Sequence, residues 1–141
     1  MPVVDPTRIV VDTSILFASL IRRQTKLRQV LLTPSDQRFY SPRFVIVEIF
    51  KHKQRIAAAT ELSEDELLEC LSAHLSRIVF IDEGVIPIGT WMEGRRLCAD
   101  VDPKDAPFVT LTLHLDGRLW TTDAELEVAL RAKGFTRFYS P

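Results

Sequence analysis

The chain has 141 residues, of which 46% are hydrophobic, and a formal net charge of −1 at pH 7. This length and composition predict a single globular domain over residues 1–141 with a sizeable hydrophobic core. No apolar run approaches the roughly 18 residues of a membrane span, and no basic flank precedes an apolar run at the N-terminus, so a cytoplasmic location is expected. The charge balance excludes a strongly basic nucleic-acid-binding protein, although clustered acids would mask a local basic patch in that sum.

The first half of the chain begins with a strand pattern over residues 8–12 (RIVVD), a β-branched run typical of a strand buried on both faces. A helical pattern follows over 13–31, and a second strand is predicted over 37–40. Ser41 and Pro42 suit the N-cap and first position of a helix over 43–59. The first half of this helix is apolar nearly all round, which predicts its burial.

The second half opens with a capping box, Ser63 with Glu66, at the start of a helix. His74 is expected on the surface of that helix, and the two cysteines, which form no CxxC pattern, are expected to be buried free thiols. The apolar stripe of the helix consists of Leu67, Leu68, Leu71 and Leu75.

The remaining elements alternate between strand and helix. A strand is predicted over 77–81, a helix over 88–98 despite Gly89 and Gly94, and a helix over 106–115 that ends at Gly117. The last elements are a strand over 118–121, a helix over 124–133 capped by Gly134, and a short strand at 138–139. This alternation predicts an α/β sheet.

Residues 100–126 concentrate negative charge. Asp100, Asp102 and Asp105 fall within six residues, and Asp123 follows the strand over 118–121. Two carboxylates about 4 Å apart repel by roughly 4 kcal/mol at an effective dielectric constant of 20, so converging carboxylates must be protonated, dispersed into water or bound to a cation.

Each acid also has a purely structural interpretation, which the local sequence leaves open. Asp102 and Asp105 suit a cap and a dipole partner of the helix over 106–115, and Asp12 and Asp123 suit helix N-caps. Glu48, in the buried half of its helix, needs either a salt bridge to Lys51 or His52 or a metal ion.

One cluster explains the acids more simply than separate structural roles. Asp12 and Asp123 end two strands, and the carboxyl ends of strands are where ligands bind in open parallel α/β sheets. Oxygen ligands without cysteine or paired histidine favour Mg²⁺ or Mn²⁺. Such ions activate water and stabilise the leaving oxygen of a phosphodiester.

Four ordered motifs carry a resemblance to a known family: VDTSIL at 11–16, VEIFKHK at 47–53, DPKDAPFVTLTL at 102–113 and LWTTDAEL at 119–126. With these motifs the sequence resembles the PIN-domain ribonucleases, and above all the compact prokaryotic members that include toxins of toxin-antitoxin pairs. The resemblance covers essentially the whole chain. It implies a three-layer α/β/α fold with a central, mostly parallel sheet.

The resemblance also implies a function, a metal-dependent endoribonuclease that uses Mg²⁺ or Mn²⁺. RNA is then the substrate, and an antitoxin-like protein and a second copy of the chain are candidate partners. The alternative is a catalytically silent module that binds RNA or a protein. A phosphoaspartyl phosphatase is disfavoured, because Ser14 stands where its pattern requires a second Asp.

Site residues follow from the resemblance position by position. The catalytic and metal-binding quartet corresponds to Asp12, Glu48, Asp105 and Asp123, with Ser14 and Thr121 as supporting hydroxyls and Asp102 as a further supporting acid or cap. The family often has Gly or Asn before the last acid, and Thr122 departs from that pattern.

Overall fold

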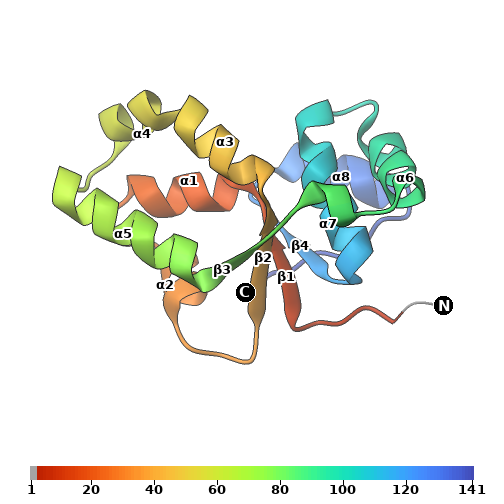
Figure 1. Ribbon diagram of the computed structural model, residues 1–141, viewed down its shortest axis with the longest axis horizontal. Coiled ribbons are helices and arrows are strands. Elements are labelled where there is room, and N and C mark those ends of the chain that lie inside the picture. The colour runs from red at the N-terminus through yellow and green to blue at the C-terminus, as the bar shows by residue number, and fades with distance from the viewer. Residues whose placement is uncertain (1–2) are drawn as a thin grey trace.

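The computed structural model describes residues 3–141 and contains a sheet of four parallel strands (Figure 1). The strands lie in the order β3-β2-β1-β4, with β1 at Arg8–Val11, β2 at Arg38–Pro42, β3 at Ile78–Ile81 and β4 at Arg118–Trp120. Val10 in β1 pairs with Tyr40 of β2 and with Leu119 of β4. The predicted α/β fold is confirmed, and the sheet is parallel throughout.

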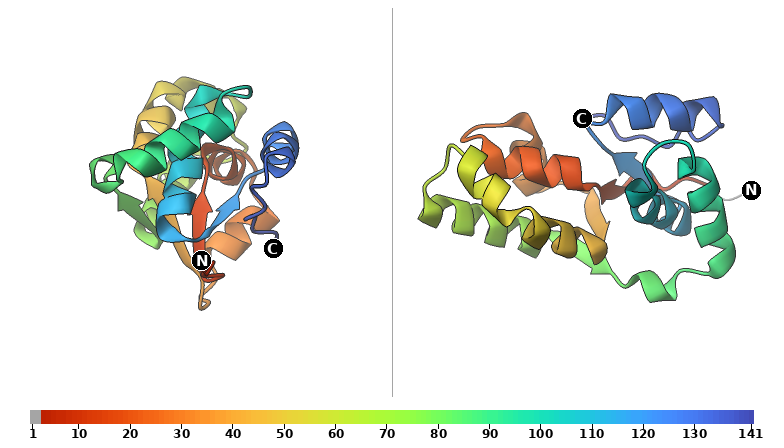
Figure 2. Two further views of the ribbon diagram at one scale, coloured as in Figure 1. Left: turned by 90° about the vertical axis from the view of Figure 1, so that its right-hand side faces the viewer. Right: turned by 90° about the horizontal axis from the view of Figure 1, so that it is seen from above.

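Helices lie on both sides of these strands, as the two orientations in Figures 1 and 2 show, which confirms the three-layer arrangement. The helices that precede β3 in the chain are α1 (Thr13–Ile21), α2 (Lys26–Leu32), α3 (Phe44–Lys51), α4 (Lys53–Ala59) and α5 (Glu64–Arg77). After β3 come α6 (Ile88–Cys98) and α7 (Ala106–Leu115), preceded by two short 3-10 turns, η1 (Glu83–Val85) and η2 (Pro103–Asp105), and α8 (Ala124–Ala132) follows β4. In the left view of Figure 2, α7 and α8 lie on opposite sides of β1 and β4. None of the helices within residues 3–141 has the length and apolar content needed to cross a bilayer.

Two predicted long helices are each divided in the structure. The helix expected over 13–31 is interrupted at 22–25, where Thr25 accepts a hydrogen bond from the Leu27 amide and so starts α2 as its N-cap. The helix expected over 43–59 breaks at His52, which lies between α3 and α4. In both cases the apolar periodicity continues across the break, so the pattern alone conceals it.

The predicted helix start at Ser41 and Pro42 is wrong, because both residues belong to β2. Strand pairing with β3 continues to Pro42, opposite Ile81. The Ser41 hydroxyl is buried and donates a hydrogen bond to the Val11 carbonyl at 3.0 Å, instead of capping a helix. Helix α3 begins after Arg43, without a side-chain cap.

The predicted orientation of α5 is also partly wrong. His74 is buried, whereas Leu68 is 58% exposed and Leu75 is 38% exposed. The His74 Nδ1 atom lies 2.5 Å from the Cys70 carbonyl oxygen, and burial lowers the pKa of the imidazole. Both cysteines are free as expected, but Cys70 is only half-buried, in contrast to Cys98.

Helix α7 ends differently from the prediction. Asp116, at φ 50°, takes the left-handed conformation that was expected of Gly117. Gly117 is required for a different reason, since a Cβ atom there would lie 2.5 Å from the carbonyl oxygen of Arg8. The predicted strand at 138–139 is reduced to one bridge between Leu119 and Phe138.

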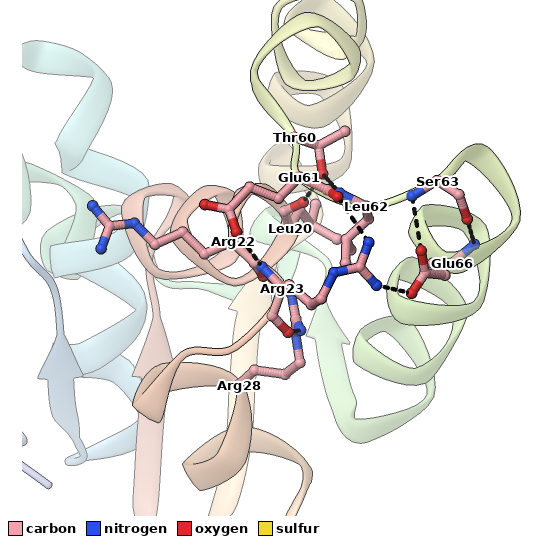
Figure 3. A network of polar contacts seen from close by, with 9 residues as sticks. All are labelled: Leu20, Arg22, Arg23, Arg28, Thr60, Glu61, Leu62, Ser63 and Glu66. Atoms are coloured by element: carbon pink, nitrogen blue, oxygen red, sulfur yellow. Dashed lines mark hydrogen bonds and ion pairs between the residues drawn. The ribbon is translucent and has the colours of Figure 1, made fainter.

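The C-terminal end of α1 is fastened to α2 and to the α4–α5 connection (Figure 3). The Thr60 hydroxyl donates to the Leu20 carbonyl at 2.7 Å, and the Glu61 amide donates to the Ile21 carbonyl at 2.6 Å. The Arg28 side chain donates to the carbonyls of Ser19, Arg22 and Arg23. These bonds satisfy backbone acceptors that a helix end leaves unpaired. They anchor the C-terminal end of α1, the helix that Asp12 begins.

Candidate active site

Asp12 lies at the junction of β1 and α1 and is only 5% exposed. Its Oδ1 atom accepts hydrogen bonds from the Ser14 hydroxyl at 2.5 Å and from the Ile15 amide at 3.2 Å, so the carboxylate is the N-cap of α1. Its own amide donates to the Trp120 carbonyl at 3.2 Å, which joins the ends of β1 and β4. Burial raises the pKa of Asp12, although the bonds from Ser14, Thr121 and Ile15 favour its ionised form.

Asp123 follows β4 and is the N-cap of α8, accepting from the Leu126 amide at 3.1 Å. The Asp123 amide donates to the Thr121 hydroxyl at 3.0 Å, and the Thr122 amide donates to the Ser14 hydroxyl at 3.1 Å. Thr122 therefore contributes through its main-chain amide. Threonine supplies this amide equally to Gly or Asn, the residues that are frequent at this position in the family. Ser14 links the acids at the ends of β1 and β4.

Glu48 is a carboxylate of α3 that is only 8% exposed. Its Oε2 atom lies 3.4 Å from His52 Nε2, one helical turn away, so Glu48 contacts one of the two partners that the sequence suggested. The His52 ring also packs edge-on against Phe17, with ring centroids 5.6 Å apart. The contact with Phe17 restricts the imidazole that faces Glu48.

Asp105 ends η2 immediately before α7. Its pKa is raised to about 7, first by burial and then by the negative charges of four other acids: Asp102, Asp12, Asp123 and Glu48. Carboxylates from three other parts of the chain therefore act on Asp105 at the carboxyl edge of the sheet.

Asp102 and Asp100 have structural partners in the same loop. Asp102 accepts a hydrogen bond from the Lys104 amide at 3.0 Å, so it caps η2 and not α7 as expected. Asp100 forms a salt bridge with Lys133. Of these two acids, Asp102 is the one whose charge is felt most strongly by Asp105.

The donor set of this cluster suits a hard divalent cation, because it consists of carboxylate oxygens. Within residues 3–141, however, no group of three or more His, Cys, Asp or Glu side chains is close enough together to hold a metal ion. Asp12 and Asp123 are turned toward backbone amides, and Glu48 lies beside His52. Carboxylates that repel one another are expected to hydrogen-bond to separate partners when no cation is bound. A carboxylate that accepts a capping hydrogen bond at one oxygen can still bind a cation with the other.

A comparison with protein-family models matches the PIN domain over residues 10–134. The chain belongs to the PIN domain family. PIN domains are in general nucleases that bind nucleic acid, and they typically use divalent metal ions. A comparison with curated proteins found no match to this chain. The PIN-domain match includes all four acids of the predicted quartet.

The stability of the metal-free PIN domain should depend on the charge of Asp105. Its pKa rises from an ordinary value of 3.8 to about 7 on folding, so the folded protein binds more protons in this window and its free energy of unfolding falls as the pH rises through it. We expect Asp105→Asn to be more stable than the wild type by about 2 kcal/mol at pH 8, and by less than half of that at pH 5. Urea unfolding in EDTA at both pH values measures the difference.

A matched control is Asp100→Asn, from the same loop. The hydrogen bond from Lys133 lowers the pKa of Asp100, so this carboxylate is ionised in the folded and unfolded states at both pH values. Its substitution should therefore change the free energy of unfolding equally at pH 5 and pH 8. A gain in Asp105→Asn that is absent, or equal at the two pH values, contradicts the raised pKa of Asp105.

Proposed function

We propose that this PIN domain is a metal-dependent endoribonuclease that hydrolyses RNA phosphodiester bonds. The proposed catalytic and metal-binding residues are Asp12, Glu48, Asp105 and Asp123. The single observation that supports this most strongly is the raised pKa of Asp105, which results in part from the charges of the other three acids. A buried acid whose pKa is raised further by the charges of other acids at a sheet edge is a frequent property of functional sites.

The chain's own residues would prepare this site before a metal ion binds. The Ser14 hydroxyl orients Asp12 and ties it to the segment that carries Asp123, and His52 restricts the position of Glu48. Bound to the four carboxylates, Mg²⁺ or Mn²⁺ would supply water activation and neutralisation of charge at the phosphodiester. Asp102 would hold the η2 turn that presents Asp105.

A toxin of a toxin-antitoxin pair is the narrower form of this proposal. The resemblance of the four motifs to compact prokaryotic PIN-domain toxins supports it. This form of the proposal implies an antitoxin-like protein and a second copy of the chain as partners. The catalytically silent module remains the second candidate. It is favoured by one observation, that within residues 3–141 the acids do not converge closely enough to hold a metal ion.

The proposal is tested by incubating the purified protein with a mixture of single-stranded and hairpin RNAs in Mg²⁺, in Mn²⁺ and in EDTA. We expect endonucleolytic products with either metal ion and intact RNA in EDTA. A protein that leaves every RNA intact in both metal ions, or that cleaves equally well in EDTA, would be a silent module or would owe its activity to a contaminant.

A further inference from the structure

A cleft with a volume of about 520 Å³ opens between the start of α3, the start of α7 and α6. It is lined by Arg43, Phe44, Val47, Glu83, Trp91 and Pro107, among others. This volume is within the range of roughly 300–1,000 Å³ that is typical of small-molecule sites. The residues of the proposed quartet do not line the cleft, so it is a separate feature of the surface.

Two residues that line the cleft stand close in the chain to two of the acids. Pro107 stands two residues after Asp105, and Phe44 stands four residues before Glu48. Residues four apart on a helix are neighbours on one face, with Cβ atoms roughly 5–6 Å apart. The Phe44 ring also packs against Phe108, with centroids 6.3 Å apart, which joins α3 to α7.

One residue, Glu83, joins the Trp91 side chain to the start of α3, which carries Phe44. The Glu83 carbonyl accepts a hydrogen bond from Trp91 Nε1 at 3.3 Å, and the Glu83 carboxylate accepts one from the Phe44 amide at 2.6 Å. Trp91 and Phe44 are half-buried, so each is anchored in the protein while it lines the cleft. A rigid aromatic surface loses little conformational entropy when a planar ring stacks on it.

The rim of the cleft adds a positive charge and apolar area. Arg43 is exposed and forms only a loose ion pair with the exposed Asp82, at 3.6 Å. Val47 is 59% exposed beside it. An aromatic platform with an arginine at its edge is the arrangement that binds single-stranded nucleic acid, where bases stack and the guanidinium pairs with phosphate or stacks in turn.

We infer that this cleft binds one unpaired nucleobase of the RNA strand, stacked against Trp91 and Phe44, next to the phosphodiester that is cleaved. The inference rests on the proposed function, because it places the base beside the proposed catalytic acids. Arg43 would hold the backbone phosphate of the same nucleotide. Since stacking tolerates every base, the cleft would select unpaired over paired RNA more than it selects a sequence.

The test measures binding without cleavage, in EDTA, by fluorescence anisotropy of a short labelled single-stranded RNA. In a set of otherwise identical RNAs, each nucleotide in turn carries an abasic ribose. For the wild type, we expect one position at which loss of the base weakens binding by roughly 5- to 100-fold, as expected for base–aromatic stacking. This comparison uses the unaltered protein, so it does not depend on any variant folding.

Variants then assign that position to the cleft. Trp91→Ala should weaken binding of the intact RNA to a similar extent. The abasic RNA should then bind Trp91→Ala no more weakly than the intact RNA does, because removing the base and removing the ring abolish the same interaction. Trp91→Phe should retain most of the binding. Phe50→Ala is the matched control, because Phe50 is 67% exposed on α3 and does not line this cleft. In Phe50→Ala the abasic penalty, meaning the loss of affinity when the base at the sensitive position is removed, should equal that of the wild type.

An abasic penalty that is undiminished in Trp91→Ala, or the lack of any sensitive position, overturns the inference and leaves the cleft as a surface for a protein partner. The proposed function is judged by a different measurement, metal-dependent cleavage that requires Asp12. If the protein cleaves RNA but no base position is sensitive, the binding of a base in the cleft is rejected and the proposed function is not. Binding to no single-stranded RNA rejects the cleft, whatever the result of the cleavage assay.

Discussion

Asp12→Asn and Asp105→Asn are each expected to reduce metal-dependent RNA cleavage by at least about a hundredfold, because loss of electrostatic stabilisation of this kind typically costs that much or more. Each change removes one negative charge with almost no change in shape. In Asp12→Asn the amide oxygen can still accept from the Ile15 amide, so the cap of α1 is kept. Initial cleavage rates at matched protein and Mg²⁺ concentrations measure the effect.

Asp100→Asn is the control for a nonspecific effect of charge. Asp100 lies in the same loop as Asp105, but its carboxylate pairs with Lys133. We expect its cleavage rate to remain within about threefold of the wild type, as for a surface ion pair. Full activity in both Asp12→Asn and Asp105→Asn, with both variants folded by circular dichroism, would remove these acids from the mechanism.

Gly94→Ala is expected to lower the free energy of unfolding by about 3 kcal/mol, the upper part of the range for overpacking a core. Gly94 is buried where α6 crosses α7, and a Cβ atom there would lie 1.9 Å from Thr110 Oγ1 and 3.2 Å from the Thr110 Cα atom. Rotation of the threonine relieves the first contact but not the second, so the two helices must separate. Urea unfolding at one pH measures the loss.

Gly89→Ala, in the same helix, is the matched control. A Cβ atom at Gly89 meets no other atom within 4 Å, so alanine should be neutral or should stabilise the helix by up to about 1 kcal/mol. Adding Thr110→Ala to Gly94→Ala should restore part of the lost stability. Equal effects of alanine at Gly89 and Gly94 would mean that the close approach of α6 and α7 is unimportant.

The strands and most helices were predictable because they depend on local patterns. The β-branched run over 8–12 and the capping box at Ser63 and Glu66 both appear in the structure as elements, at Arg8–Val11 and Glu64–Arg77. The break at His52 was not predictable, because apolar residues on both sides of it keep a helical period. The prediction of Ser41 as a helix N-cap failed for a different reason, because its hydroxyl donates to a strand 30 residues away and does not cap the helix that follows.

The placement of the acids was predictable in part. Asp12, Asp105 and Asp123 stand at strand or helix ends as expected, Glu48 is buried within α3, and the pKa of Asp105 responds to the other three. Their assignment as a catalytic site stays a prediction. The orientation of each carboxylate could not be predicted from the sequence, because it depends on contacts with groups such as the Leu126 amide and the His52 ring. The cleft at Trp91 was also missed, since its walls come from three segments and no local motif marks them.

Calorimetric titration of Mn²⁺ into the wild type and into Asp12→Asn, carried to millimolar metal, tests the central claim most directly. The claim is that acids from β1, α3, η2 and β4 form one metal site. It predicts saturable binding to the wild type that is lost or strongly weakened in Asp12→Asn. Saturable binding of equal strength to both proteins, or binding to neither, would contradict the claim and favour the silent module.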